Sequence, residues 1–331
     1  MPDSSIFHRN PILSATLLLL SILAIWPDVA AKSAATPADQ AAYRAEVEKW
    51  RKEREASITS RNGWLSVAGL FFLKEGRNTF GRDATNQLVL PASAPPRAGW
   101  FDLRQGRVFA QVDQGVTATF NKQLVSPGTE IELKDTDDLG KRDALILGTL
   151  TLFVHLSGEK LAIRMLNAES ALLKNFTGLK WFPIDPAYRV VARFASFDAP
   201  KPVEVPNILG DLERYTSPGV LTFTLHGQEY QLQPFQVGKQ ETSRFFIVFK
   251  DLTSGKETYG AARFVNASLP KDGTTVLDFN RAYNPPCAYN PFTTCPLPLP
   301  SNRLNVRILA GERNYRTHER SQNKSLSKGS S

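Results

Sequence analysis

The densest group of polar side chains in this sequence lies between residues 278 and 295, a segment that also holds both cysteines. The segment leaves an apolar stretch and enters a proline-rich loop, and proline fixes φ, so little conformational entropy is lost when such a loop holds polar groups in place. We interpret the loop as one wall of a ligand pocket. Arg281 would anchor an anion through two parallel hydrogen bonds, with Asp278 as acid, base or orienter of that arginine. The candidate ligand-binding residues here are Asp278, Asn280, Arg281, Tyr283, Asn284, Tyr289 and Asn290.

A second interpretation of this loop stays open. Asn and Asp side chains also cap turns, and Asp278 with Arg281 can form a purely structural pair. A neighbouring segment adds Tyr259 and Arg263, which alternate with apolar residues and so can share one face of a sheet. We include both in the candidate site, although an ordinary hairpin explains their segment equally directly.

The two cysteines, Cys287 and Cys295, are eight positions apart. In an exported protein we expect a disulfide between them, and closing so short a loop stabilises by roughly 2–3 kcal/mol in the chain-entropy model. Two inert thiols, or one reactive thiol or metal ligand, are the alternatives. A nucleophilic Cys287 would need a base, and histidine is scarce in this chain.

Most familiar catalytic motifs are absent from the sequence: it has no H-E-x-x-H, C-x-x-C, G-x-S-x-G, P-loop or G-x-G-x-x-G pattern. Of four histidines, only His155 and His226 fall in the expected folded region. We interpret His155 as a strand residue satisfied by its neighbours and His226 as an exposed turn residue. The sequence therefore predicts no metal and no cofactor, and it leaves open whether the protein is an enzyme.

The amino terminus has the pattern of a secretory signal peptide. A polar start is followed by the apolar run Ile12–Trp26 and by small residues at 29–31. Fifteen apolar residues fall short of the roughly 20 that a spanning helix needs. We expect cleavage before Lys32 and a periplasmic or secreted protein with no stable membrane span afterwards. An uncleaved anchor is the alternative.

Composition and charge narrow the classes of function further. The chain has 331 residues, of which 42% are hydrophobic and 22% charged, so global disorder is excluded. The net charge of +8 is partly carried by the expected disordered tail 312–331, which holds five basic and two acidic residues. Basic residues do not gather with aromatics in a nucleic-acid module. We therefore predict a small-molecule ligand and no nucleic-acid partner. The oligomeric state is left open.

Short strands punctuated by turns are expected to position these residues. Thr36, Pro37 and Asp39 form a helix start, and Tyr43, Val47 and Trp50 continue it as an apolar stripe. After residue 61, apolar segments recur every 8–12 residues between turn signals, which indicates an antiparallel sandwich or barrel. The fold class is mostly β, with one amphipathic N-terminal helix. The expected divisions are a signal peptide at 1–31, the helix at 32–60, a β-sandwich at 61–168, a second antiparallel β region with the Pro/Cys loop at 169–311, and the tail at 312–331.

Several longer segments resemble one known family, the bacterial and archaeal family of domain of unknown function 1684. The resemblance extends from about Trp50 to Glu312 and implies no activity. The segments that carry it are GWLSVAGLFFLKEG (63–76), LAIRM (161–165), WFPIDPAYRV (181–190), FKDLTSGKETYGAARF (249–264) and LDFNRAYNPPCAYNPFTTCPLP (277–298).

A second resemblance concerns the N-terminal half. Gly81-Arg82, the strand at 86–90 and the strand at 148–154 resemble parts of a forkhead-associated domain, a β-sandwich that binds phosphothreonine. The phosphate-binding set is incomplete, because Ser93 is followed three residues later by Pro96 instead of His, and Asn121 by Lys122 instead of Gly. The resemblance thus implies the sandwich and not the phosphopeptide binding.

Two hypotheses for function follow. The first is an exported binding module whose polar pocket holds a small anionic or polyhydroxylated ligand. The second is a metal-independent hydrolase or transferase in which Asp278 or Cys287 does the chemistry and Arg281 stabilises developing charge. A purely structural envelope protein is a third alternative.

Overall fold

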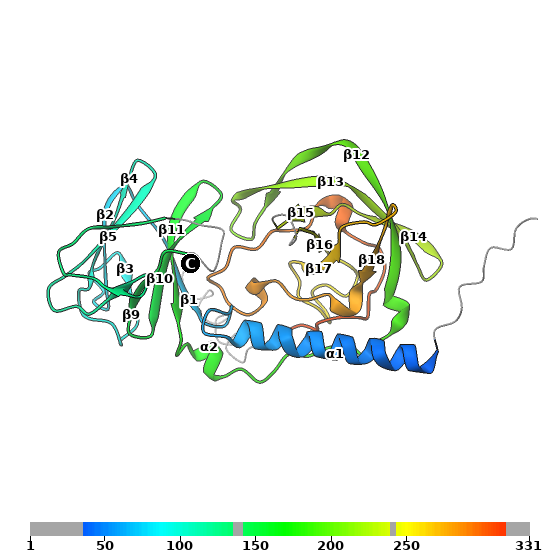
Figure 1. The fold of residues 1–331 in the computed structure, drawn as a ribbon, viewed down its shortest axis with the longest axis horizontal. Coiled ribbons are helices and arrows are strands. Elements are labelled where there is room, and N and C mark those ends of the chain that lie inside the picture. The colour runs from blue at the N-terminus through cyan, green and yellow to red at the C-terminus, as the bar shows by residue number, and fades with distance from the viewer. Residues whose placement is uncertain (1–35, 135–141, 239–242, 316–331) are drawn as a thin grey trace, which may run out of the picture.

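A computed structural model describes residues 36–134, 142–238 and 243–315, and it places two β-rich bodies beside each other (Figure 1). The expected signal peptide at 1–31 lies outside the described residues, as does the part of the expected tail beyond residue 315. We call residues 61–168 the sandwich and residues 169–315 the second body.

One long helix, α1 (Pro37–Thr59), runs along the second body (Figure 1). Thr36 caps it in a capping box with Asp39, and Pro37 occupies its first turn. Val47 and Ile58 are its buried residues. The chain then turns sharply back, and a Cβ at Gly63 would collide with the carbonyl oxygen of Ile58. Glycine is therefore required for this turn into the sandwich.

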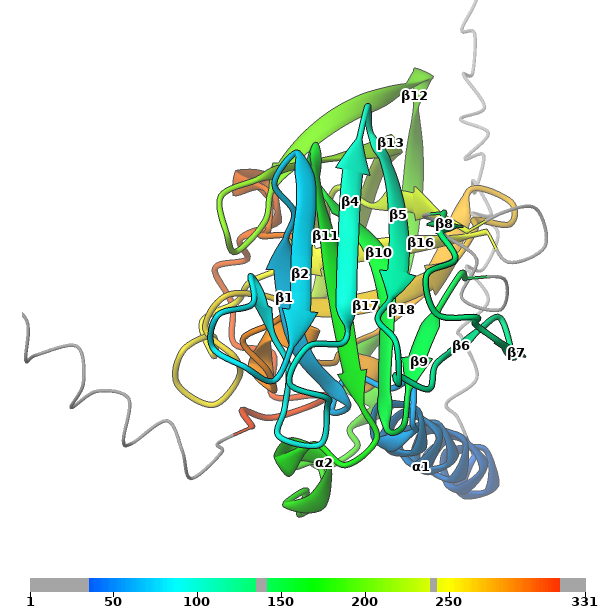
Figure 2. The same cartoon turned by 90° about the vertical axis from the view of Figure 1, so that its left-hand side faces the viewer.

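The sandwich consists of two sheets (Figure 2). Their inner faces share one apolar core. Phe80, Phe101, Leu152 and Ile163 lie in that core. The first sheet has, in spatial order, β1 (Val67–Phe72), β11 (Lys160–Asn167), β10 (Leu150–Ser157), β9 (Leu145–Leu147), β6 (Thr119–Phe120) and β7 (Gln123–Leu124). The second has β3 (Leu88–Val89), β2 (Gly76–Gly81), β4 (Gly99–Arg104), β5 (Arg107–Val112) and β8 (Ile131–Leu133).

The second body is built around a long hairpin of β12 (Arg189–Pro206) and β13 (Leu212–Leu225). Its four-stranded sheet is completed by β14 (Gln228–Leu232) and β18 (Thr274–Asp278), and a three-stranded sheet holds β15 (Phe235–Val237), β16 (Arg244–Phe249) and β17 (Arg263–Ser268). Apolar side chains such as Leu221, Phe249 and Leu277 fill the space between the sheets. A short helix α2 (Ala171–Lys174) connects the two bodies.

These observations confirm the expected fold class: a mostly β chain with antiparallel sheets and one long N-terminal helix. No helix in the described ranges is both long and apolar enough to cross a membrane. One boundary is wrong, because the packed body continues past residue 312. Glu312 is only 1% exposed and accepts hydrogen bonds from Asn284, whose position 28 residues upstream gave no local signal for that burial.

Candidate functional site

The polar segment expected to form a pocket wall lies in the second body and is largely buried under α1. The Tyr43 hydroxyl donates to Asp278 Oδ1 at 2.8 Å and accepts from Asn280 Nδ2 at 2.9 Å. Asn280 also contacts the backbone of Asp185 on both sides, donating to its carbonyl and accepting from its N–H. Asp278 and Asn280 thus attach the helix to the sheet.

Arg281 pairs with two carboxylates of the protein itself. It contacts Glu46 of α1, and its Nε lies 3.4 Å from Asp278 Oδ2. The contact with Asp278 is the structural pair that the sequence left open. An arginine held in this way links the helix to the turn after β18.

Asn284 and Tyr289 converge on the buried carboxylate of Glu312. Asn284 donates to it through its N–H and Nδ2, and the Tyr289 hydroxyl donates to Oε1. Arg54 Nε lies 3.7 Å from the other oxygen. Burial raises the pKa of Glu312 and of Tyr289. We call these four residues the Glu312 cluster.

The other predicted residues are also occupied by protein contacts. The guanidinium of Arg54 lies 4.3 Å from the ring centre of Tyr283, whose hydroxyl accepts from Asn266. Arg263, 1% exposed, pairs with Asp251 at 3.2 Å and donates to the carbonyls of Ile308 and Ala310. Tyr259 is buried in an apolar cluster that includes Cys287.

Asn290 and the cysteines lie in the loop where the two bodies meet. Asn290 Nδ2 donates to the carbonyls of Trp64 and Val67 in the sandwich. Cys287 and Cys295 form a disulfide. Cys287 therefore carries no free thiol for nucleophilic attack in this structure, and the hypothesis that uses it as a nucleophile loses its support.

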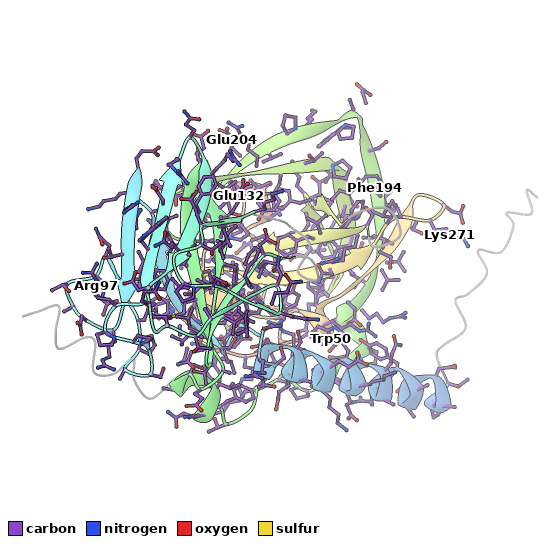
Figure 3. The ribbon with its side chains drawn as sticks, turned by 60° about the vertical axis from the view of Figure 1, so that its left-hand side comes forward. Trp50, Arg97, Glu132, Phe194, Glu204 and Lys271 are labelled. Carbon is purple, nitrogen blue, oxygen red and sulfur yellow. A yellow bond between two sulfur atoms is a disulfide. The ribbon has the colours of Figure 1, made fainter. Side chains whose placement is uncertain are left out.

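A cavity of about 1280 Å³ lies between the sandwich and the second body, and none of the nine predicted ligand-binding residues lines it. Its lining comes from β10, β11, the β12–β13 hairpin and β15. Figure 3 labels Glu204 near the end of β12, on the part of the hairpin that lines the cavity. The charged, histidine and tyrosine side chains of the lining are Arg142, His155, Glu159, Lys160, Arg164, Glu204, Asp211, Glu213, Arg214 and Tyr215.

The sandwich side of the cavity has more basic than acidic side chains, since Glu159 is its one lining carboxylate among the described residues. We call Arg142, His155, Lys160 and Arg164 the basic wall. β10 and β11 pair so that Phe153 lies opposite Arg164 and His155 opposite Ala162. Alternation along a strand then puts Phe153, His155 and Arg164 on one face of the sheet. Arg164 Nη2 donates to His155 Nε2 at 2.8 Å, and the guanidinium of Arg142 lies 4.0 Å from the ring centre of Phe153.

His155 is held neutral by this wall. Burial, assisted by the charges of Arg164 and Arg142, lowers its pKa from 6.5 to about 3. Because Nε2 accepts the hydrogen bond from Arg164, we assign the imidazole proton to Nδ1. His155 is thus a neutral donor beside two cationic side chains.

The opposite side is the acidic wall (Glu204, Asp211 and Glu213), carried by the β12–β13 hairpin. Glu213 accepts from the Tyr215 hydroxyl at 2.8 Å and from Asn207 Nδ2 at 3.2 Å. Asp211 accepts from Lys160 at 2.7 Å, a bond that crosses between the bodies and lowers the pKa of this carboxyl.

Two walls of opposite charge suit a ligand with an anionic group at one end and hydrogen-bond donors at the other. Guanidinium groups bind carboxylates and phosphates, whereas carboxylates accept from hydroxyls. Among the described residues, no three or more His, Cys, Asp or Glu side chains lie together in a way that would hold a metal ion.

Sequence reasoning missed this cavity because its walls lie far apart along the chain. It considered His155 and interpreted it as a residue satisfied by its neighbours, which the bond from Arg164 supports. The available signal was the shared strand face of His155 and Arg164. Nothing in the sequence placed the tip of the hairpin, near residue 211, opposite that face.

One known protein family matches this chain. The model described as "Protein of unknown function (DUF1684)" matches residues 174–313, which span nearly all of the second body. The chain belongs to this family. That confirms the family predicted from the sequence over residues 174–313, compared with the expected stretch from about Trp50 to Glu312, and the match includes the whole Pro/Cys loop.

Solved structures give two further similarities. The chain is 36% identical to an uncharacterized protein from gene locus rrnAC0354 of Haloarcula marismortui, solved by solution NMR, over 42% of this chain and 78% of that one, with a TM-score of 0.37. It is 21% identical to a chain in the crystal structure of the FhaA FHA domain complexed with the intracellular domain of Rv3910, over 28% of this chain and 82% of that one, with a TM-score of 0.20. No curated protein matches this chain.

Proposed function

We propose that the protein is a binding module that holds a small anionic, polyhydroxylated ligand, such as a sugar acid or a sugar phosphate, in the cavity between its two bodies. The observation that carries this proposal is the opposite net charge of the two sides of a cavity of about 1280 Å³. Arg142, Lys160 and Arg164 outnumber Glu159 on the sandwich side, and Glu204, Asp211 and Glu213 outnumber Arg214 on the hairpin side. The proposal keeps the ligand class expected from the sequence and moves the site away from residues 278–290.

The basic wall supplies the anion end of the site. Arg164 is fixed by its hydrogen bond to His155, so its planar guanidinium is oriented before a ligand arrives. Preorganised donors lose less conformational entropy on binding than flexible ones. The Nδ1–H of a neutral His155 adds a donor without adding another charge.

The acidic wall supplies acceptors for hydroxyl groups. Glu213 is oriented by Tyr215 and Asn207, and a carboxylate has acceptor sites beyond these two bonds. The lining holds four basic side chains (Arg142, Lys160, Arg164, Arg214) and four acidic ones (Glu159, Glu204, Asp211, Glu213), so the cavity carries no net charge. This balance favours a ligand with both an anion and hydroxyls over a bare polyanion.

Thermal unfolding with named probes tests the proposal. Glucuronate and glucose 6-phosphate carry both features, whereas glucose lacks the anion and inorganic phosphate lacks the sugar hydroxyls. A ligand at 100 times its Kd stabilises by about 2.7 kcal/mol, which raises Tm measurably. We expect at least one of the two anionic sugars to raise Tm, and to do so more than either single-feature probe at equal concentration.

Variants locate the site. Arg164→Gln and Glu213→Gln should remove the ligand-dependent rise in Tm. The matched controls Arg193→Gln and Glu229→Gln change an exposed ion pair on the hairpin sheet and should retain the rise. No response to any probe, or the same response in cavity and control variants, would overturn the proposal.

We also propose that the protein is exported to the periplasm or secreted. The signal-peptide pattern at 1–31 supports this, and a disulfide such as Cys287–Cys295 persists in oxidising compartments. Cell fractionation with mass spectrometry of the recovered chain tests it. The expected mature protein begins at Lys32, and an intact chain confined to the cytosol would contradict the proposal.

A further inference from the structure

The loop of residues 287–297, which we call the joint loop, contacts the basic wall of the cavity, the hairpin that carries the acidic wall, and the start of the sandwich. It belongs to the second body by sequence, and its first residues lie in a 3-10 turn at Pro286–Ala288. Three side-chain or backbone contacts leave it in different directions.

The first contact ties the loop to the start of β1. Asn290 is 2% exposed, and its Nδ2 donates to the carbonyls of Trp64 at 3.0 Å and Val67 at 2.7 Å. Its Oδ1 accepts from the N–H of Phe292 at 2.7 Å, which fixes the orientation of the amide. Both hydrogens of one buried amide thus bridge from the second body to the sandwich.

The second contact reaches the basic wall, and the third reaches the hairpin that carries the acidic wall. The Thr294 hydroxyl lies 3.3 Å from His155 Nε2 in the basic wall. The Cys295 carbonyl accepts from the N–H of Ile208 at 3.0 Å, and Leu297 N–H donates to the Pro206 carbonyl at 2.9 Å. Pro206 and Ile208 lead into the hairpin tip that carries Asp211 and Glu213. One short loop is therefore bonded to the basic wall and to the hairpin segment next to the acidic wall.

The disulfide closes this loop around the residues that make the contacts. Cys287 and Cys295 flank Asn290 and Thr294, and both sulfurs are buried. Inside the ring, the Thr293 hydroxyl donates to the Asn290 carbonyl at 3.2 Å. A closed, internally bonded ring limits the conformations available to Asn290 and Thr294.

We infer that Asn290 and Thr294 are positioning residues that set the spacing of the two cavity walls, and that the Cys287–Cys295 disulfide holds them in place. Opening the disulfide loosens the joint between the bodies while each body keeps its own core. The effect on the joint does not depend on the proposed ligand, so the inference stands or falls separately from the proposed function.

Hydrogen exchange measured by mass spectrometry on the disulfide-bonded protein tests the joint directly. Dithiothreitol reduces the disulfide by two electrons and two protons, leaving two protein thiols and the cyclic disulfide of the reagent. Because the amides of Ile208 and Leu297 bond the joint loop to the hairpin, we expect residues 206–211 and 292–297 to exchange about tenfold faster after reduction and in Asn290→Ala. The interior strands β5 and β16 should exchange as before.

A matched control and a combined variant separate positioning from general destabilisation. Asn266→Ala also removes a side-chain amide bond, but that bond to Tyr283 lies within the second body, so the joint segments should be unchanged. If the disulfide acts through Asn290, reducing Asn290→Ala should add little to the acceleration. If reduction and Asn290→Ala each accelerated exchange and their factors multiplied when combined, the inference would be contradicted. It would also be contradicted if β5 and β16 exchanged as much faster as the joint segments do.

Two further measurements keep the inference testable if Asn290→Ala does not fold. The double variant Cys287→Ser with Cys295→Ser, and the single variant Thr294→Val, weaken the same joint with smaller changes. In each, solvent entry should raise the NMR-measured pKa of His155 from about 3 toward 6.5, because burial is the main cause of its depression. An unchanged His155 titration together with unchanged exchange would overturn the inference.

Discussion

The Glu312 cluster and the cavity between the two bodies use the same kinds of side chain in opposite ways. In the cluster, Arg54, Asn284 and Tyr289 surround one buried carboxylate. In the cavity, Arg164 and Glu213 are steadied by neighbours yet both line a space of about 1280 Å³. Polar groups that are all directed at one another hold the fold together, whereas charges on separate walls leave room for a ligand.

Breaking the buried ion pair of Arg263 and Asp251 should have the largest effect on stability. Arg263→Met leaves Asp251 buried without its cation, and such losses cost about 3–5 kcal/mol. Urea unfolding measures the change. The matched control Arg193→Met breaks a pair whose side chains are 74% and 57% exposed, and it should cost about 1 kcal/mol or less. Equal costs at both sites would contradict the structural role given to Arg263.

Within the Glu312 cluster, Tyr289→Phe should have the next largest effect. It removes one donor from a buried carboxylate, and a hydrogen bond to a charged group contributes about 1.5–3 kcal/mol. The control Tyr230→Phe removes an exposed hydroxyl bond to Gln228 and should change the free energy of unfolding by less than about 0.5 kcal/mol. If Tyr289→Phe left the free energy of unfolding unchanged, the cluster would not be a stabilising network.

Acid should destabilise the protein through His155. Its pKa is lowered in the folded state, to about 3 from 6.5, so the unfolded chain takes up the proton first. Stability therefore falls as the pH drops from 6.5 toward 3, by at most about 1.4 kcal/mol for each pH unit. Denaturant unfolding at several pH values should show a shallower acid slope in His155→Gln.

A His155→Gln variant that keeps the full wild-type acid slope would contradict this explanation, because the depressed pKa of His155 would then not be the source of the slope. His226 lies exposed in the turn between β13 and β14, as the sequence predicted.

The smallest effect on stability is expected from the cavity itself. Arg214 has a side chain that is 77% exposed, with Glu204 3.5 Å away and Glu159 3.9 Å away. Arg214→Gln should change the free energy of unfolding by less than about 0.5 kcal/mol. A cost of several kcal/mol would place Arg214 among the fold-stabilising residues and blur the distinction between the two regions.

The sequence predicted the fold class because the signals for it are local. Thr36, Pro37 and Asp39 mark the start of the helix, and alternation with turn residues marks the strands. It also identified Asn284 and Tyr289 of the Glu312 cluster, because they lie among polar residues crowded into one segment. Their partners lie on α1 and at the far end of the chain, and a local pattern carries no information about such distant contacts.

The cavity was beyond sequence reasoning for a related reason. Arg164 and Glu213 are about 50 positions apart, and each is an ordinary charged residue on a strand. They face one cavity because Lys160 and Ser157 bond to Asp211 across the two bodies. The joint loop adds bonds to Pro206 and Ile208 on one side and to His155 on the other. The crowding of polar residues along the chain therefore predicted where the buried polar network lies. It did not predict where the cavity lies.

Titration calorimetry with glucuronate and glucose 6-phosphate on two variants decides whether the ligand binds in the cavity or at residues 278–290. Glu213→Gln changes the cavity, and Arg281→Gln changes the segment that the sequence favoured. We expect Glu213→Gln to weaken binding of the responding probe about tenfold or more, since a hydrogen bond to a charged group is lost, while Arg281→Gln binds as the wild-type protein does. Binding that is lost in Arg281→Gln and retained in Glu213→Gln would contradict the account and return the site to residues 278–290.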